Sequence, residues 1–235
     1  MNRCLILLTD PEPVPDLIRR LRSDDRGLGL KVAHSLGHLE KALAEAPPRV
    51  RLMAFCSGVV VPPALLKALP GPAYNLHPGP PEVRGLYPSV HAIYQGLPTF
   101  GTTLHEMAEG VDSGPIVAVD RFPMPAPAER WRLDRLSLAS ALAMVGRLAP
   151  QLADIDTPLP HLPDVQWSGP AHRRADFEAL CQLPSRIDAA EFDRRYRAVG
   201  EGPEHALSIR IFGQRFVLDN QRDPAAASRA GRSRR

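Results

Sequence analysis

Cysteine is scarce in this sequence, and long hydrophobic runs are missing. The three cysteines, at positions 4, 56 and 181, form no C-x-x-C pair, which argues against a disulfide framework or a zinc knot. The longest apolar runs, residues 5–8 and 59–66, are too short to span a bilayer. The first apolar run is followed at once by Asp10 and Glu12, unlike a signal peptide, so we expect a cytoplasmic protein.

Several common nucleotide-binding and hydrolase motifs are also missing. No G-x-G-x-x-G follows the first predicted strand, and no G-x-x-x-x-G-K-[ST] loop occurs anywhere in the sequence. A G-x-S-x-G elbow is absent as well. These absences disfavour a plain dinucleotide enzyme, a P-loop ATPase and an α/β-hydrolase.

The composition is that of a globular protein with a basic end. Hydrophobic residues make up 44% and charged residues 23% of the 235 residues, close to the averages for soluble domains. The formal net charge is +3, but residues 221–235 hold five arginines and one aspartate, so the rest of the chain is close to neutral. This tail lacks apolar periodicity and is predicted to be disordered. It could contact RNA or an acidic partner, although a solvated end is the simpler interpretation.

Strand and helix patterns alternate through the first 152 residues. Short apolar runs predict strands, and apolar residues at helical spacing predict helices. The expected strands are residues 3–9, 30–34, 50–56, 73–76, 101–107 and 116–122. The expected helices are residues 13–22, 37–45, 63–69, 88–95 and 131–152. This alternation predicts an α/β fold with a doubly wound, mostly parallel sheet.

The pattern changes after residue 152. Residues 156–170 hold four prolines and are expected to cross the molecule in extended form. Short helices are expected at 175–180 and 189–197, and a hairpin is expected around residues 212–214, between strands 206–211 and 215–218. We therefore divide the chain into a main domain (1–152), a small C-terminal helix and hairpin subdomain (153–220) and the tail (221–235). The subdomain is expected to pack on the main domain or to make an oligomer contact, because so few residues form only a marginal core.

Three polar residues stand where an α/β sheet usually binds its ligands, beyond the carboxyl ends of strands. Asn75 and His77 lie two residues apart at a predicted strand end, so their side chains point to the same face. Asp112 lies in a glycine-flanked loop between two predicted strands. An amide and an imidazolium can stabilise a tetrahedral oxyanion, while a carboxylate can raise the pKa of the imidazole and help to move a proton. Acyl transfer to an amine requires such a set.

The residues around these three form linked motifs. N-x-H-P at the strand end is followed in order by R-G, A-I-x-x-G, G-x-T-x-H and G-V-D-x-G-x-I. This order resembles the formyltransferases that use 10-formyltetrahydrofolate, which include the glycinamide ribonucleotide, methionyl-tRNA and sugar-nucleotide enzymes and the formyltetrahydrofolate hydrolases. The resemblance is good over residues 50–122, loose over 1–49 and weak beyond. It implies a formyltransferase-like variant of the Rossmann fold, with catalysis in residues 1–152.

The resemblance also implies roles for particular residues. Asn75 and His77 would polarise the formyl carbonyl, and Asp112 would tune His77 and relay protons. The pterin slot would be lined by an apolar stretch after the third strand and by the loop around Asp112, namely by Phe55, Gly58, Val59, Val60, Met107, Val111 and Gly114. The expected formyl donor is 10-formyltetrahydrofolate, and no metal is implied.

The turn after His77 departs from the family pattern x-S-L-L-P-x-x-R-G. Residues 78–85 are one residue shorter and lack the serine and the leucines, which leaves the pocket shape and the acceptor open. Arg84, in this turn, could orient an anionic acceptor or only the loop.

Other interpretations stay open for individual residues. His105 is more typical of a core residue than of a site residue. Together, His77, His105 and Asp112 could also form a two-histidine, one-carboxylate metal site. The metal interpretation does not account for Asn75 or for the surrounding glycines.

The sequence therefore predicts a one-carbon transferase that moves a formyl group from 10-formyltetrahydrofolate to the primary amine of a small molecule, for example an amino sugar nucleotide. The alternatives are a methionyl-tRNA formyltransferase-like enzyme, a formyltetrahydrofolate hydrolase and an inactive folate-binding relative. Residues 153–235 are too few for the larger C-terminal barrel of the tRNA enzymes. Asp10 and Glu12 make the segment after the first strand acidic, which argues against the phosphate-bearing glycinamide ribonucleotide as the acceptor. No membrane partner is expected, tRNA is the one nucleic acid kept as an alternative, and a homodimer is left open.

Overall fold

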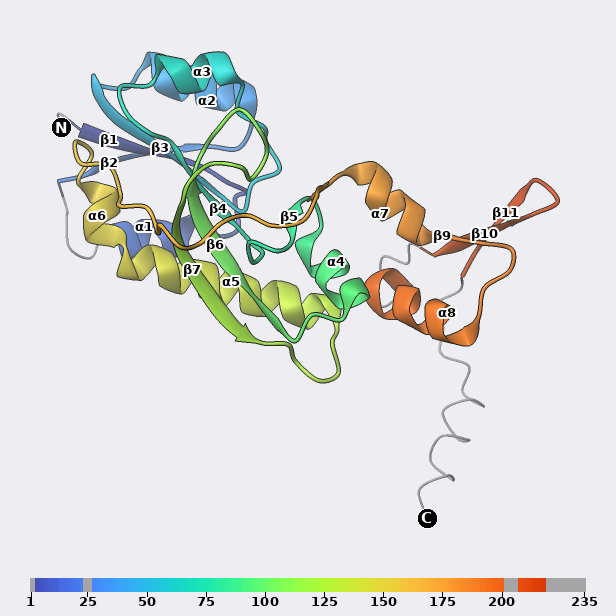
Figure 1. The fold of residues 1–235 in the computed structure, drawn as a ribbon. Helices are drawn as coiled ribbons and strands as arrows, with labels where there is room; N and C mark the ends of the chain where they lie inside the picture. The colour runs from blue at the N-terminus through green and yellow to red at the C-terminus, as the bar shows by residue number, and fades with distance from the viewer. Residues whose placement is uncertain (1–2, 23–26, 201–206, 219–235) are drawn as a thin grey trace.

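The computed structural model describes residues 3–22, 27–200 and 207–218. Its centre is a six-stranded sheet in the order β2-β1-β3-β4-β6-β7 (Figure 1). The strands are β1 (Arg3–Leu8), β2 (Gly29–Ala33), β3 (Arg49–Phe55), β4 (Tyr74–His77), β6 (Thr99–Glu106) and β7 (Ile116–Pro123). The first four are mutually parallel, and β6 and β7 pair antiparallel with their neighbours. The predicted α/β fold with a mostly parallel sheet is confirmed.

Helices cover both faces of the sheet, as Figure 1 shows. The helices α1 (Val14–Leu21), α5 (Arg130–Arg147) and α6 (Ala149–Ala153) pack on one face, and α2 (Leu36–Ala44) and α3 (Pro63–Ala68) pack on the other. The interior strand β1 is buried on both sides, with Leu5 and Leu7 in one core cluster and Ile6 and Leu8 in the opposite one. This burial explains why its sequence is continuously apolar rather than alternating.

The expected long helix over residues 131–152 is two helices in the structure. The first, α5, ends at Arg147, and α6 begins at Ala149. Pro150 explains the break, because proline has no N–H for the bond to the fourth residue before it and its ring clashes with that residue's carbonyl.

A crossing segment, residues 154–172, leads from α6 back across the sheet, and Figure 1 shows its path in front of β6 and β4. Main-chain bonds attach it along its length. The amide of Leu159 donates to the Tyr74 hydroxyl at 2.8 Å, and the amide of Leu162 donates to the Ile116 carbonyl at 2.7 Å. At its end, β8 (Ala171–His172) pairs with β5 (Arg84–Gly85), two short strands that the sequence did not predict.

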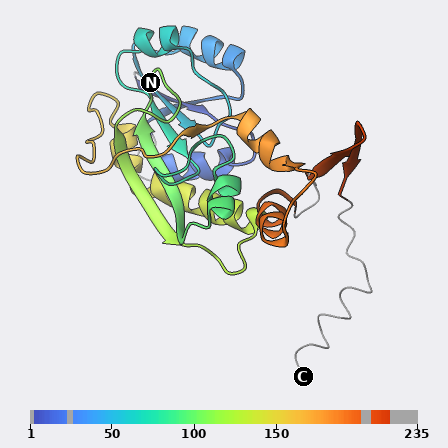
Figure 2. The ribbon, with the colours of Figure 1, turned by 45° about the vertical axis from the view of Figure 1, so that its right-hand side comes forward.

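The C-terminal part packs beside α4 (Pro88–Gln95), as Figures 1 and 2 show. It contains α7 (Arg174–Cys181), α8 (Ala189–Arg195), a π-helical turn (Tyr196–Gly200) and a three-stranded sheet of β9 (Gln182–Leu183), β10 (Ser208–Ile211) and β11 (Gln214–Val217). Its apolar residues form one core cluster with α4 and α5. The expected hairpin is present, with Phe212 and Gly213 at positive φ in its two-residue turn.

The expected tail, 221–235, and residue 206 of the hairpin lie outside the described residues. The division of the chain at residue 152 stays a prediction. Among the described helices, none is long and apolar enough to cross a membrane.

Candidate active site

Strand β4 brings the two predicted residues to one face of the sheet. Asn75 and His77 are separated by Leu76, which points into the opposite core cluster. Strand β6 runs antiparallel beside β4, and its register places His105 directly opposite Asn75. Because residues directly opposite on neighbouring strands share a face, His105 joins the site rather than the core.

Asp112 reaches the same point from the loop between β6 and β7. Its φ of 45° lies in the left-handed region, which Asp tolerates better than most residues. The hydroxyl of Ser113 donates to the Gly110 carbonyl at 2.7 Å, which tightens the loop. A Cβ on Gly114 would lie 2.0 Å from the Glu106 carbonyl oxygen, so only glycine fits where the loop returns to β7. Gly114 is therefore a structural requirement of this loop.

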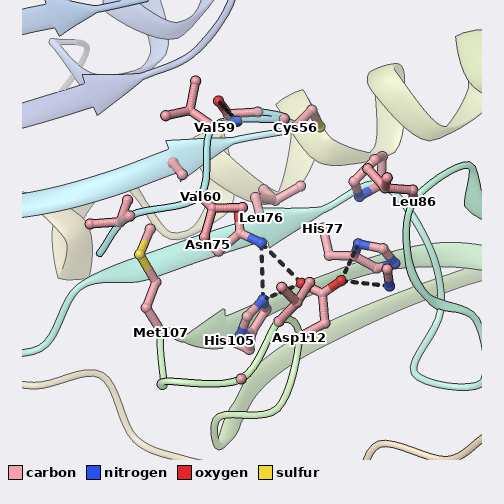
Figure 3. Close-up of a pocket in the computed structure, with 18 of the residues that line it drawn as sticks. Cys56, Val59, Val60, Asn75, Leu76, His77, Leu86, His105, Met107 and Asp112 are labelled. Carbon is pink, nitrogen blue, oxygen red and sulfur yellow. Dashed lines mark hydrogen bonds and ion pairs between the residues drawn. The ribbon is translucent and has the colours of Figure 1, made fainter. Parts of the chain in front are cut away.

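These four side chains form a buried cluster with the carboxylate at its centre, as Figure 3 shows. Asp112 Oδ2 lies 3.2 Å from His77 Nδ1, and Asp112 Oδ1 lies 3.2 Å from His105 Nε2. The amide nitrogen of Asn75 lies 3.3 Å from Asp112 Oδ1 and 3.1 Å from His105 Nε2. Both imidazoles and the carboxylate are buried, whereas Asn75 is half-buried.

Burial sets the charge states of this cluster. It lowers the pKa of His77 below its ordinary value, and the neighbouring Asp112 carboxylate offsets this effect only in part. The Asp112 carboxylate thus raises the pKa of this imidazole, as the sequence predicts, but burial has the larger effect and the net pKa is lowered. For Asp112, burial favours a higher pKa, but the hydrogen bond from His105, the two imidazole charges and the amide of Gly85 together hold its pKa at about 2. The cluster is thus an ionised carboxylate beside a neutral His77.

The unusual turn after His77 supports the cluster from the other side. A Cβ on Gly79 would lie 2.6 Å from His77 Nε2, so this glycine leaves room for the ring. The same nitrogen lies 2.8 Å from the Val83 carbonyl oxygen, and the amide of Gly85 donates to Asp112 Oδ2 at 2.8 Å. Arg84 donates to the Val111 carbonyl at 3.3 Å, so its contact is with the loop.

A cavity of about 510 Å³ opens beside the cluster. Three exposed apolar side chains stand at its walls, those of Val60, Leu86 and Val111. Three of the four described non-glycine residues with positive φ also line it, namely Cys56, Tyr87 and Asp112. A non-glycine residue at positive φ costs conformational free energy, and such residues are concentrated at functional sites. An apolar cavity with a few convergent polar groups is typical of a small-molecule site.

Five of the seven residues expected to line the pterin slot do line this cavity: Gly58, Val59, Val60, Met107 and Val111. Phe55 does not, because it is fully buried in the core on the side of α1 and α5. Gly114 does not line it either, and its part is the return of the loop to β7.

Sequence reasoning missed several residues of this region. Leu86, Tyr87 and Arg174 line the cavity, and Trp167 of the crossing segment contacts both site histidines. An isolated tryptophan within a proline-rich polar stretch was the one available signal for Trp167. No pattern in the sequence places Arg174 near residues so distant along the chain.

The metal interpretation does not fit the geometry. Within the described residues, no group of three histidine, cysteine or acidic side chains could hold a metal ion. One ring nitrogen of His77 and one of His105 each contact an oxygen of Asp112 directly. The three groups therefore do not converge on a common position that a metal ion could occupy.

Similarity to known proteins agrees with the family inferred from the sequence. Residues 31–133 match the family model described as formyl transferase. The methionyl-tRNA formyltransferase of Rhizorhabdus wittichii is 32% identical over 151 residues, which is 62% of this chain and 46% of that enzyme. That of Acidithiobacillus ferrooxidans is 31% identical over 167 residues, covering 70% of this chain and 51% of the relative. The chain thus spans about half the length of these curated relatives.

Solved structures share the fold over nearly the whole chain. A sugar N-formyltransferase from Shewanella superposes with a TM-score of 0.75 at 17% identity, covering 93% of this chain and 97% of that one. An N-formyltransferase from Helicobacter canadensis, in complex with folinic acid and dTDP-3-aminofucose, superposes with a TM-score of 0.63 at 15% identity, covering 84% and 80%. The inferred resemblance to the formyltransferase family is confirmed.

Proposed function

We propose that this chain transfers a formyl group from 10-formyltetrahydrofolate to the primary amine of a small molecule. The observation that carries the proposal is the cluster in which Asp112 lies between two buried imidazoles, with Asn75 beside it at the wall of an apolar cavity. The match to the formyl transferase family model includes all four of these residues.

Asn75 is the member of the cluster that a substrate can reach, because it is half-buried and lines the cavity. One of its two amide N–H groups is directed at Asp112 Oδ1, and the other, which lies against His105 Nε2, would donate to the formyl oxygen as negative charge develops there. A donor held in place for this charge accelerates acyl transfer by about 100-fold or more.

His77 is arranged to take up a proton. Its Nδ1 faces the Asp112 carboxylate and its Nε2 faces the Val83 carbonyl, so both nitrogens have acceptors. A neutral imidazole carries one N–H and can satisfy only one of them, whereas an imidazolium satisfies both. Because both ring nitrogens face these acceptors, the proton lost by the attacking amine would reach Nδ1 of His77 by way of the Asp112 carboxylate, which lines the cavity.

The proton balance of the reaction closes with this arrangement. A bond forms between the acceptor nitrogen and the formyl carbon, and the bond from that carbon to the donor nitrogen breaks. The acceptor amine loses one proton and the departing nitrogen gains one, so His77 needs only to hold the proton between these steps.

The cavity suits a flat ring system with an attached anion. Its apolar walls, which include Val60 and Val111, can pack on the pterin ring of the folate donor. Among the described lining residues, Arg174 carries the one permanent positive charge, and it is exposed. We assign Arg174 to a phosphate group of the acceptor. This assignment favours an amino sugar nucleotide, the kind of ligand present in the Helicobacter structure.

The tRNA alternative rests on the curated relatives, which are methionyl-tRNA formyltransferases. A sugar acceptor is supported instead by the fold, because the Shewanella sugar N-formyltransferase superposes over 93% of this chain.

The test is an assay of the full chain with 10-formyltetrahydrofolate and a panel of acceptors. The panel holds amino sugar nucleotides, the same amino sugars without the nucleotide, methionyl-tRNA and buffer alone. We expect an N-formyl amino sugar nucleotide as product. Formate release in buffer would instead identify a hydrolase, and no turnover with any acceptor would identify a folate-binding relative.

Arg174→Ala sharpens the acceptor assignment. We expect KM to rise at least about tenfold for an acceptor that carries phosphate and to change little for the donor, because the charge pair is at the acceptor end. A rise confined to the donor's KM would place Arg174 at the carboxylates of the folate tail.

A further inference from the structure

Trp167 lies against both histidines of the cluster. Its ring centroid is 4.9 Å from that of His105 with the planes at 89°, and 5.8 Å from that of His77 with the planes at 73°. These are edge-to-face contacts, which aromatic rings favour. No other aromatic ring of the described residues contacts either imidazole.

The indole is held in this position from several sides. Its Nε1 donates to the carbonyl of Gly114 at 2.8 Å, in the loop that carries Asp112. The amide of the next residue, Ser168, donates to the Pro81 carbonyl at 3.0 Å, in the turn after His77. Trp167 therefore links the two loops that surround the carboxylate.

The indole covers a side of the cluster that the cavity does not. Trp167 is absent from the cavity wall, whereas Asn75, His77, His105 and Asp112 all line it. The turn at Gly79 and Val83 closes His77 at its Nε2 edge. With the indole in place, His77 is 3% and His105 is 2% exposed.

We propose that Trp167 is a positioning residue, which excludes water from the side of the cluster away from the cavity and holds both imidazoles in contact with Asp112. This role in catalysis rests on the function proposed above, whereas the contacts do not depend on it. The substrate side of the site is thus built by the sheet, and its rear wall is supplied by the crossing segment.

Water exclusion has a measurable consequence for His77. The groups whose charges act on this imidazole are Asp112, from the loop after β6, and His105, from β6 itself. The carboxylate favours the imidazolium, the second imidazole disfavours it, and burial is the largest influence against it. Removing the indole would admit water and weaken that influence, so the pKa of His77 would rise toward its ordinary value.

The experiment compares Trp167→Ala and Trp167→Phe with a matched control, Trp131→Ala. Trp131 is the other tryptophan of the chain, it is 52% exposed on α5, and it lies outside the cavity wall. The histidine side chains are isotope-labelled and titrated by NMR, with His77 assigned by its loss in His77→Gln. We expect the proton affinity of His77 to rise at least about threefold in Trp167→Ala, with Trp167→Phe intermediate and the control unchanged.

Kinetics give a second measurement on the same variants. We expect kcat to fall about tenfold in Trp167→Ala, with the KM of the donor within about threefold, because the indole does not line the cavity. The acidic limb of the pH–rate profile should move with the NMR titration. Trp167→Phe should restore most of the rate, since a phenyl ring still covers the imidazoles.

Fluorescence keeps the proposal testable if Trp167→Ala does not fold. In Trp131→Phe, Trp167 is the sole tryptophan, and an adjacent imidazolium quenches indole emission. We expect its emission to fall as the pH drops through the titration of the cluster, and to lose this dependence in a Trp131→Phe, His77→Gln, His105→Gln variant.

Two results would overturn the proposal. One is a His77 titration in Trp167→Ala that matches the unmodified protein. The other is emission from Trp167 that does not respond to the cluster. Both measurements are made without substrate, so they stand even if no acceptor is formylated, and failure of formyl transfer alone would count against the proposed function only.

Discussion

Two pairs of histidines, one at the Asp112 loop and one between α4 and β8, are built in opposite ways. His77 and His105 share a carboxylate, with Asp112 3.2 Å from each. His91 of α4 and His172 of β8 instead stack on one another, with ring centroids 3.6 Å apart and planes within 5°. The first pair has a counter-charge at its centre, and the second pair has none between its rings.

This difference decides what each pair can do with a proton. Burial, with the charge of His172 as a smaller influence, lowers the pKa of His91 to about 4. Its Nε2 is buried without a hydrogen-bond partner within the described part of the chain. A proton there would lie against a second imidazole, while a proton on His77 would lie against a carboxylate. Burial alone therefore does not make a histidine functional, because its neighbours decide whether it can be charged.

Replacing Asp112 with Asn should make the first pair resemble the second, because it removes the counter-charge. Of the substitutions considered, it should have the largest effect on the reaction rate. The size and hydrogen-bonding reach are kept while the charge is lost. We expect the rate to fall by about 100-fold or more, the range for a general acid–base group, with folate-analogue affinity within a few-fold. Because the carboxylate stabilises the imidazolium, its loss should lower the pKa of His77 further and move the acidic limb of the profile to lower pH.

Steady-state rates between pH 5 and 9 and calorimetry with a folate analogue measure both effects. A variant that loses binding without a separate loss of rate would show that Asp112 only shapes the loop. An unchanged rate and profile would remove the acid–base part of the proposal.

Asn75→Ala should have the next largest effect on the reaction rate. Loss of one oxyanion donor should reduce kcat about 100-fold, or about 2.7 kcal/mol, with little change in folding because the side chain is half-buried. His91→Phe is the matched control from the second pair, and we expect it to leave kcat within about threefold. A near-normal rate in Asn75→Ala would exclude the amide from catalysis.

The second pair should instead appear in the stability of the fold. The unfolded chain binds a proton at His91 near pH 6.5, while the folded chain does so only near pH 4, so stability is lost as the pH falls through this window. The loss assigned to His91 should be about 1–3 kcal/mol by pH 4. His91→Phe keeps a ring on His172 and should flatten this dependence in urea unfolding between pH 7 and pH 4. Parallel curves for both proteins would mean that His91 titrates normally.

The features of the site that the sequence could predict are those that depend on local structure, and the others depend on contacts between distant residues. The i, i+2 spacing of Asn75 and His77 follows from local structure, and so does the loop around Asp112. The place of His105 depends on the register between β4 and β6, which no local pattern determines. The direction of the His77 pKa depends on how deeply the ring is buried, and the sequence names the carboxylate but not the burial.

The fold itself was largely predictable, with the exceptions explained by long-range packing. The six central strands and the five helices up to residue 147 follow hydrophobic periodicity to within a few residues. The two-residue strands β5, β8 and β9 were missed because they have no periodicity of their own and exist only through their pairing. Phe55 was misplaced for a related reason, since an apolar residue at a strand end can face either the cavity or the core.

A third imidazole–carboxylate contact, at the surface, should give the smallest effect. His161 of the crossing segment lies 2.9 Å from the Glu106 carboxylate, with the side chains 44% and 29% exposed. Water and salt screen such pairs, so His161→Ala should cost less than about 1 kcal/mol, or a shift in Tm of under about 4 °C. Unfolding at low and high salt measures the cost, which should shrink further as salt increases.

We expect the formyl-transfer rate of His161→Ala to stay within about twofold, since this contact is outside the cavity wall. A larger loss of rate would mean that the pair holds the crossing segment, and with it Trp167, against the cluster.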